Sequence, residues 1–219
     1  MKNFIRSCGY FVSELRSGNL DINIPAFLLK SAYYHLLSKN IFADHSTTIL
    51  GIRNIETRGR LTVGANGNTG WLNKNDRTFV NVQGRLVIEG IVGVGKGCRI
   101  CIHKGAVCTI RQCSITGLTN IIITHGLEIG KGSTIAWGCE ILDADGHAIN
   151  YEGRHERDNA IVIGDHVWIG SHVKILKGVH IADDSVVAAN AVVTKSFAEK
   201  NVLIAGNPAQ IIKRGVEWG

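Results

Sequence analysis

The most constraining feature of this sequence is an apolar residue at every sixth position across its C-terminal part. The unbroken series consists of Ile163, Ile169, Ile175, Ile181, Val187 and Val193. Two residues before each member stands a second, mostly smaller side chain: Ile161, Val167, Val173, Val179, Ser185 and Ala191. A pair of inward residues followed by a turn predicts one short strand per hexad. Successive strands must then wind round a prism, because a straight strand would need unbroken alternation.

The same spacing occurs in earlier blocks, each in a different phase. The clearest are Ile123, Ile129, Ile135, Ile141 and, before them, Val82, Ile88, Val94, Ile100, Ala106. The changes of phase predict loops or irregular corners at 107–120 and 143–160. A meander of hairpins would need many tight turns at short intervals, but Asn66-Gly67 and Asp145-Gly146 are the only such dipeptides. We therefore expect a mainly β fold, a parallel β-helix over 43–206 with a loop extruded at 143–160.

The two ends of the chain do not follow the period. Residues 24–38 have apolar side chains at helical spacing with Pro25 near the start, which predicts a helix within an N-terminal segment, 1–42. We expect this helix to pack on the first coil; a membrane-surface role is the alternative, because Lys30 and Lys39 flank it. Gly206-Asn207-Pro208 ends the repeat, and 207–219 is expected to form a short C-terminal helix over the last coil.

Composition and charge narrow the class of protein. The chain has 26 glycines and only 6% aromatic residues, as expected for a repetitive β architecture with tight corners. Its formal net charge of +6 favours an anionic partner, but no Lys/Arg run exceeds two residues, so no nucleic acid partner is expected. Neither a signal peptide nor an apolar stretch of membrane-spanning length is evident. We therefore expect a cytoplasmic protein without stable membrane insertion.

The cysteines permit two interpretations. The spacing Cys98-x-x-Cys101 followed by Cys108-x4-Cys113 is compatible with zinc. Cys98 and Cys139, however, fall in the smaller slot of the repeat, which favours a role in core packing. We expect no metal.

The run IGDHVWIGSHVKILKGVHIADDSVVAANAVVTKS, followed by IAGNPAQIIK, resembles the hexapeptide-repeat acyltransferases, and among them the bacterial sugar and polysaccharide O-acetyltransferases. The resemblance is specific over 121–218 and merely periodic over 43–120. It implies a left-handed β-helix and a homotrimer with active sites in the clefts between neighbouring prisms. It also implies transfer of acetyl from acetyl-CoA to a hydroxyl of a sugar in a bacterial surface polysaccharide or its precursor.

The polar stretch 142–160 interrupts the repeat and is the candidate catalytic loop. The resemblance places the catalytic histidine at His147, within Asp143-Ala-Asp145-Gly-His147. A histidine titrates near neutral pH, so it can take the proton of an acceptor hydroxyl and return one to the CoA thiolate. Asp145 is the candidate for fixing the imidazole tautomer. Asp143 is equally well explained as a cap of the turn, and His155 has no counterpart in the motif.

The resemblance also suggests the cosubstrate contacts. Trp168 occupies an outward slot, where a large ring needs cover from a subunit or a ligand; the resemblance puts it beside the catalytic histidine near the thioester. The contacts to acetyl-CoA fall on Ser171, Ala189, Thr194, Lys195 and Lys213.

A further basic position of the family reads Gln210 in this chain. One expected charge on the cosubstrate phosphates is therefore missing. Arg214 or Lys200 could replace it.

Three alternatives remain open. An amino-sugar N-acetyltransferase or an antibiotic acetyltransferase would use the same base and cosubstrate. A carbonic-anhydrase-like zinc β-helix is suggested by the equal spacing of His103, His125 and His147, but that spacing is longer than a regular coil of three hexads. A scaffold protein without activity would not be expected to keep both the loop histidine and the outward tryptophan.

Overall fold

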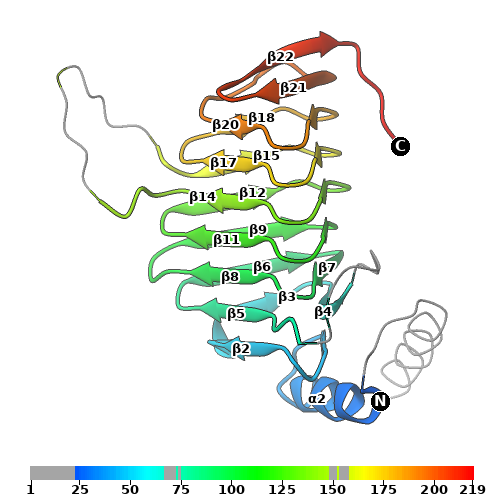
Figure 1. Cartoon of the computed structure of the whole chain (residues 1–219). Coiled ribbons are helices and arrows are strands. Elements are labelled where there is room, and N and C mark those ends of the chain that lie inside the picture. Colours follow the sequence, from blue (N-terminus) through cyan, green and yellow to red (C-terminus); the bar gives the residue numbers. More distant parts are fainter. Residues whose placement is uncertain (1–22, 67–72, 74, 148–151, 153–157) are drawn as a thin grey trace.

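The computed structural model describes residues 23–66, 73, 75–147, 152 and 158–219. These residues wind into a three-sided prism of parallel strands, with a helix at one end and a hairpin at the other (Figure 1). The chain passes from sheet 1 to sheet 2 to sheet 3 in every coil, which confirms the predicted parallel β-helix.

Sheet 1 contains β1 (Ile41–Ala43), β4 (Arg60–Asn66), β7 (Ile91–Gly95), β10 (Ser114–Ile115), β13 (Thr134–Ile135), β16 (Trp168–Ile169), β19 (Val186–Val187), β21 (Val202–Gly206) and β22 (Ala209–Arg214). Sheet 2 contains β2 (Thr48–Leu50), β5 (Phe79–Val82), β8 (Arg99–Ile102), β11 (Asn120–Ile123), β14 (Glu140–Leu142), β17 (Lys174–Leu176) and β20 (Val192–Val193). Sheet 3 contains β3 (Ile55–Thr57), β6 (Arg85–Glu89), β9 (Val107–Arg111), β12 (Gly126–Ile129), β15 (Ile161–Ile163) and β18 (His180–Ile181). A short 3-10 turn, η1 (Ile52–Asn54), links β2 and β3.

Three coils carry the candidate site, and we number them by their place along the prism. Coil 5 runs β13–β14–β15, coil 6 runs β16–β17–β18, and coil 7 begins with β19 and β20. Trp168 pairs with Val186, and Lys174 with Val192, in each case three hexads further along the chain. Both sixfold series lie inside this part of the prism, where every member is buried. The period therefore predicted the core residue by residue.

The interruptions of the period have different structural forms. At 107–120 the chain continues through β9, β10 and β11 without an extruded loop, so the break is an irregular corner. Ser114 pairs with Gly93 of the coil below and with Thr134 of the coil above. Both separations exceed three hexads slightly, so the corners absorb the extra residues. Ile141 pairs with Ile175, much further along the chain, because coil 5 contains the predicted loop at 143–160.

A second long insertion was not predicted. Leu61 pairs with Val92, well beyond three hexads along the chain, because coil 2 contains extra residues between the end of β4 and the start of β5. The sixfold signal is weak in this part of the sequence, so a phase change there is hard to detect.

The predicted N-terminal helix is confirmed as α2 (Ile24–Leu36), and its packing on the first coil as well; residues 1–22 of the expected segment lie outside the described residues. The Asn23 side chain caps it by accepting from the backbone N–H of Ala26. Phe27 stacks on Phe42 of β1 with ring centroids 6.4 Å apart. The Lys30 ammonium donates to backbone carbonyls of the first coil. In the described part of the chain, no helix has the length and apolar character needed to cross a bilayer.

The predicted C-terminal helix is wrong. Residues 209–214 form β22, which pairs antiparallel with β21 after the chain reverses at Asn207-Pro208. The physical reason is the free edge of β21: a following strand satisfies its unpaired backbone groups at once, whereas a helix of this length would be marginal without tertiary support.

Candidate functional site

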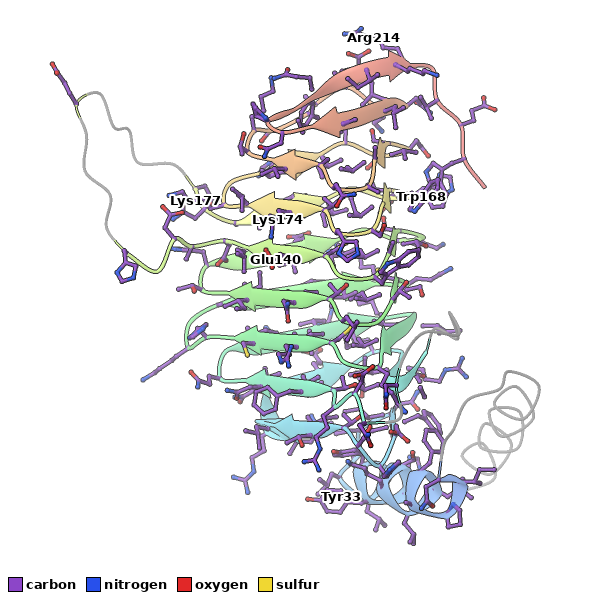
Figure 2. All side chains as sticks on the ribbon, in the orientation of Figure 1. Tyr33, Glu140, Trp168, Lys174, Lys177 and Arg214 are labelled. Carbon is purple, nitrogen blue, oxygen red and sulfur yellow. The ribbon has the colours of Figure 1, made fainter. Side chains whose placement is uncertain are left out.

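Apart from Trp168 and Lys213, which belong to strands of sheet 1, the predicted site residues lie along two edges of the prism, at the two ends of sheet 2. We call them edge 1–2, where the chain turns from sheet 1 into sheet 2, and edge 2–3, where it leaves sheet 2. The loop of coil 5 begins at edge 2–3, after β14, and residues 143–147, 152 and 158–160 of it are described. Figure 2 shows Lys177 beside this loop and Trp168 on the opposite side of the prism.

Edge 1–2 carries Ser171 and Ala189, in the turns that follow β16 and β19, and Trp168 lies on sheet 1 just before this edge. Trp168 occupies the outward slot of β16 and is 43% exposed. The turns of coils 6 and 7 stack directly, since the Asn190 N–H donates to the Ser171 carbonyl at 2.9 Å. Only glycine fits at Gly170, because an added Cβ would lie 2.7 Å from the backbone nitrogen of Ala189. Edge 1–2 therefore presents the hydroxyl of Ser171 and a stretch of backbone at Ala189 that a ligand can approach closely, with the indole ring of Trp168 next to them.

Edge 2–3 carries the acidic residues that lead into the loop. Asp143 is fully buried and accepts hydrogen bonds from the backbone N–H groups of Thr124 (2.7 Å), His125 (2.7 Å) and Gly126 (2.8 Å). The interpretation of Asp143 as a turn cap is thereby confirmed. It anchors the first residue of the loop to the coil below.

Asp145 and His147 follow on the exposed part of this loop. The carboxylate of Asp145 forms an ion pair with the ammonium of Lys177 from coil 6. This contact ties the loop to the next coil. The role of Asp145 in fixing the His147 tautomer stays a prediction, and His155 lies outside the described residues.

Thr194 and Lys195 follow β20 on the same edge, two coils above the loop. The hydroxyl of Ser196 donates to the carbonyl of Gly178 at 3.2 Å, which stacks this turn on that of Lys177. The Lys195 ammonium donates to Gln210 Oε1 at 2.7 Å. At Gln210, where the resemblance led us to expect a basic residue, the side-chain oxygen therefore accepts a hydrogen bond from the ammonium of Lys195.

The other basic residues that were candidates for contacting the cosubstrate phosphates are less well placed for that role. Lys213 belongs to β22 and pairs with Leu203 on sheet 1. Arg214 donates to Glu199 at 2.8 Å, and Lys200 to Asp183 at 2.6 Å, so both possible substitutes have carboxylate partners.

An aromatic cluster around Trp168 was missed by the sequence analysis. The Trp218 ring stacks on His166 with centroids 4.2 Å apart and planes 8° from parallel, and lies 6.0 Å from Trp168. Its indole N–H donates to the His166 carbonyl at 3.0 Å. His166 in turn contacts Asp184 at 3.0 Å. No sequence pattern pointed to this contact, because Trp218 is distant from His166 in the chain and lies outside the period.

The cysteines belong to the core rather than to the site. Cys98 and Cys139 fill the smaller slot as predicted, and burial raises the pKa of Cys98 to about 12 and that of Cys139 to about 11. A thiol with so high a pKa is a poor nucleophile at neutral pH. Across the described ranges, no group of three His, Cys, Asp or Glu side chains is arranged to hold a metal ion.

Comparison with known proteins agrees with this architecture. Residues 160–195 match the family described as "Bacterial transferase hexapeptide (six repeats)". An uncharacterized 24.8 kDa protein from the cps region of Klebsiella pneumoniae is 35% identical over 93% of this chain and 92% of its own. The "Putative lipopolysaccharide biosynthesis O-acetyl transferase WbbJ" of Escherichia coli is 50% identical over 55% of this chain and 67% of its own.

Among solved structures, the polysialic acid O-acetyltransferase OatWY is similar with a TM-score of 0.55 and 28% identity, over 80% of this chain and 88% of that one. The chain therefore belongs to the hexapeptide-repeat transferases, in the part of the family whose members are named as acetyltransferases. The left-handed β-helix expected from the resemblance is the fold of this family.

Proposed function

We propose that this protein transfers acetyl from acetyl-CoA to a sugar hydroxyl of a bacterial surface polysaccharide or its precursor, in the clefts of a homotrimer. The observation that carries the proposal is the division of the site residues between edge 1–2 and edge 2–3. In one chain these edges lie at opposite ends of sheet 2, whereas the proposed ring of three chains would place edge 1–2 of one protomer against edge 2–3 of the next.

The order of residues along the prism fits a cosubstrate in such a cleft. Ala189 on edge 1–2 and Lys195 on edge 2–3 both belong to coil 7. Ser171 lies on coil 6, and His147 on the loop of coil 5. If coil 7 held the phosphates of acetyl-CoA, its pantetheine arm would pass Ser171 on coil 6. The thioester at the end of this arm would then lie at the level of His147.

The chemistry follows from this placement. In the proposed reaction His147 removes the proton of the acceptor hydroxyl, whose oxygen attacks the thioester carbonyl. The carbon–oxygen bond forms, the carbon–sulfur bond breaks, and the proton passes from His147 to the CoA sulfur. The indole of Trp168 excludes water beside the thioester. No buried cysteine is needed as a nucleophile.

A hydroxyl acceptor is favoured over an amine because WbbJ and OatWY are both named as O-acetyltransferases. Amino-sugar N-acetylation is the alternative on the same site. Because acetyl-CoA is a metabolite of the cell interior, we place the protein in the cytoplasm.

The decisive experiment uses two variants that damage opposite edges. His147→Ala is expected to lose acetyl transfer by about 10²–10⁴-fold while still binding CoA in calorimetry. Ala189→Trp should block the cosubstrate on edge 1–2. Co-expressed in equal amounts, the two inactive chains should recover about a quarter of wild-type activity, because that fraction of clefts has both edges intact.

The matched control combines His147→Ala with Lys195→Glu, which both damage edge 2–3 and should not complement. Full activity of the His147→Ala variant would refute the assignment of His147 as the general base. Complementation in the control pair, or a monomer by light scattering, would refute the shared cleft.

A further inference from the structure

Before the chain reaches the loop of coil 5, edge 2–3 passes through one turn in each of coils 1 to 4. We call these turns the turn column; they are residues 51–54, 83–84, 103–106 and 124–125. Successive turns are joined by hydrogen bonds. The Asn54 side chain donates to the Gln83 carbonyl at 3.3 Å, the Gln83 N–H to the Ile102 carbonyl at 2.8 Å, and the His103 N–H to the Ile123 carbonyl at 2.8 Å. The last turn is the one that the buried carboxylate of the loop holds, so the column leads directly to the candidate catalytic loop.

The turn column carries basic side chains, and its sequence contains no acidic residue. Arg53, Lys104, His103 and His125 all belong to it and are exposed. In the described part of the chain, the ion pairs and side-chain hydrogen bonds involve neither Arg53 nor Lys104. The Nε2 atom of His125 accepts from the side-chain amide of Asn159 at 3.2 Å, which leaves Nδ1 as the nitrogen that can donate. The column therefore presents two cations without a counter-charge and two imidazoles.

The adjoining face of sheet 3 shows a different arrangement of charge. Its carboxylates and guanidinium groups pair with one another across coils 1 to 4, in a ladder formed by Glu56, Arg58, Arg85, Glu89, Arg111 and Glu128. Glu89, for example, lies 2.9 Å from Arg58 and 3.2 Å from Arg111. The ladder contains as many acids as bases, so its field is small at any distance from the sheet. The positive charge of the turn column is therefore not cancelled by the face beside it.

The turn column lies within reach of a polymer whose reacting unit is at the loop. Neighbouring strands of a sheet are about 4.7–4.9 Å apart, so Lys104, on coil 3, lies roughly 10 Å along the prism from the level of coil 5. Arg53 lies two coils further on. The carboxylate of Asp145 between them and His147 is already paired with Lys177. A chain of sugars that continues from His147 along edge 2–3 therefore passes a series of positive groups, which attract negative charge and give a neutral chain no such gain.

We propose that the acceptor is an acidic polysaccharide: its carboxylates lie against the turn column, with Lys104 and Arg53 as their cationic partners, while one of its hydroxyls is presented to His147. The inference rests on the proposed function and narrows the acceptor from any surface polysaccharide to one that bears carboxylates. Because the contacts are exposed, each ion pair contributes little by itself, and the affinity comes from several of them along the chain of sugars.

The test measures the binding of three tetrasaccharides by calorimetry without acetyl-CoA: α2,8-linked sialic acid, α1,4-linked galacturonic acid, and neutral maltotetraose. Wild type should bind an acidic tetramer more tightly than maltotetraose, and this affinity should fall as salt is added. Lys104→Gln should weaken acidic binding by about two- to fivefold at low salt, and the double variant Arg53→Gln/Lys104→Gln by about tenfold. The affinity for CoA should not change in either variant.

The matched control is Lys131→Gln. Lys131 is also exposed, but it lies between β12 and β13, where the chain passes from sheet 3 to sheet 1, so this variant loses the same net charge away from the turn column. It should bind the acidic tetramers as wild type does. An equal loss of affinity in Lys131→Gln overturns the inference, because it would show a general effect of net charge. Equal binding of maltotetraose, or no binding of either acidic tetramer, overturns it as well.

The proposed function fails in a different way, which an assay of CoA release with the bound tetramer detects. Binding that depends on Lys104 without any transfer of acetyl would support the turn column as an acidic-glycan site and overturn only the proposed reaction.

Discussion

At the scale of single residues, the loop depends on one buried carboxylate. Asp143 ends the inward ladder of β14, and its two oxygens take up three backbone N–H groups from the turn at 124–126. Only an ionised carboxylate can accept all three at full strength. The sequence suggested a capping role for Asp143, but it did not show that the capped turn belongs to the coil below or that Asp145 pairs with Lys177.

Replacing Asp143 by Asn should therefore destabilise the protein. The amide has a single acceptor oxygen, so at least one of these partly buried N–H groups loses its partner, at a cost of about 1–3 kcal/mol. Urea unfolding measures this loss. Asp158→Asn is the matched control: the Asp158 carboxylate accepts the exposed N–H of Ala160, and the change should cost much less. Equal stability of the two variants would contradict the anchoring role.

At the scale of elements, the C-terminal hairpin and tail complete the prism and reach the site. Strand β22 covers the edge of β21, and the chain then returns along sheet 1 so that Trp218 meets His166 and Trp168. The sixfold period predicted the strands, turns and inward residues well, because every coil packs equivalent side chains on those of the coil before it. The period could not predict β22 or the tail. Neither segment belongs to the hexad repeat, and the conformation of both depends on contacts with residues that are distant in the sequence.

Trp218→Ala should expose the Trp168 ring. The lost aromatic contacts are worth about 0.5–1.5 kcal/mol, so the tail should detach without global unfolding. Acrylamide quenching of tryptophan fluorescence should rise for the remaining exposed rings, and the KM for acetyl-CoA should increase. Trp218→Phe, which keeps a ring but loses the indole N–H bond to the His166 carbonyl, should behave between wild type and Trp218→Ala. Unchanged quenching in Trp218→Ala would show that Trp168 does not depend on the tail.

At the scale of the whole molecule, the prism keeps apart the two edges that carry the proposed site residues. Along the chain, sheet 2 lies between the turns that carry Ser171 and Ala189 and the segments that carry His147 and Lys195. Figure 2 shows Trp168 and Lys177 on opposite sides of the prism. A rigid stack of parallel ladders cannot bend to bring these edges together, because the coils are joined by continuous backbone hydrogen bonds. Association of chains is the remaining way to build a site from both edges.

Activity per chain should consequently fall on dilution, at the concentration where the assembly dissociates. The prism itself has a continuous buried core and should keep its circular dichroism signal over the same range. Sedimentation velocity at matched concentrations tests whether the two transitions of activity and mass coincide. Constant activity in a fully monomeric sample would contradict the shared cleft.

The sequence by itself determined the repeating interior: the sixfold alternation of Ile and Val with smaller residues specifies strands, turns and the buried set, because these depend on contacts one coil away. It also located the loop at 143–160, through a change of phase. Only the tertiary structure decided which candidate residues share an edge, that Asp143 is a buried anchor, and that Trp218 packs beside Trp168. These contacts join segments of unrelated periodicity, and their geometry follows from the number of residues in each coil and from the path of the chain beyond the last one.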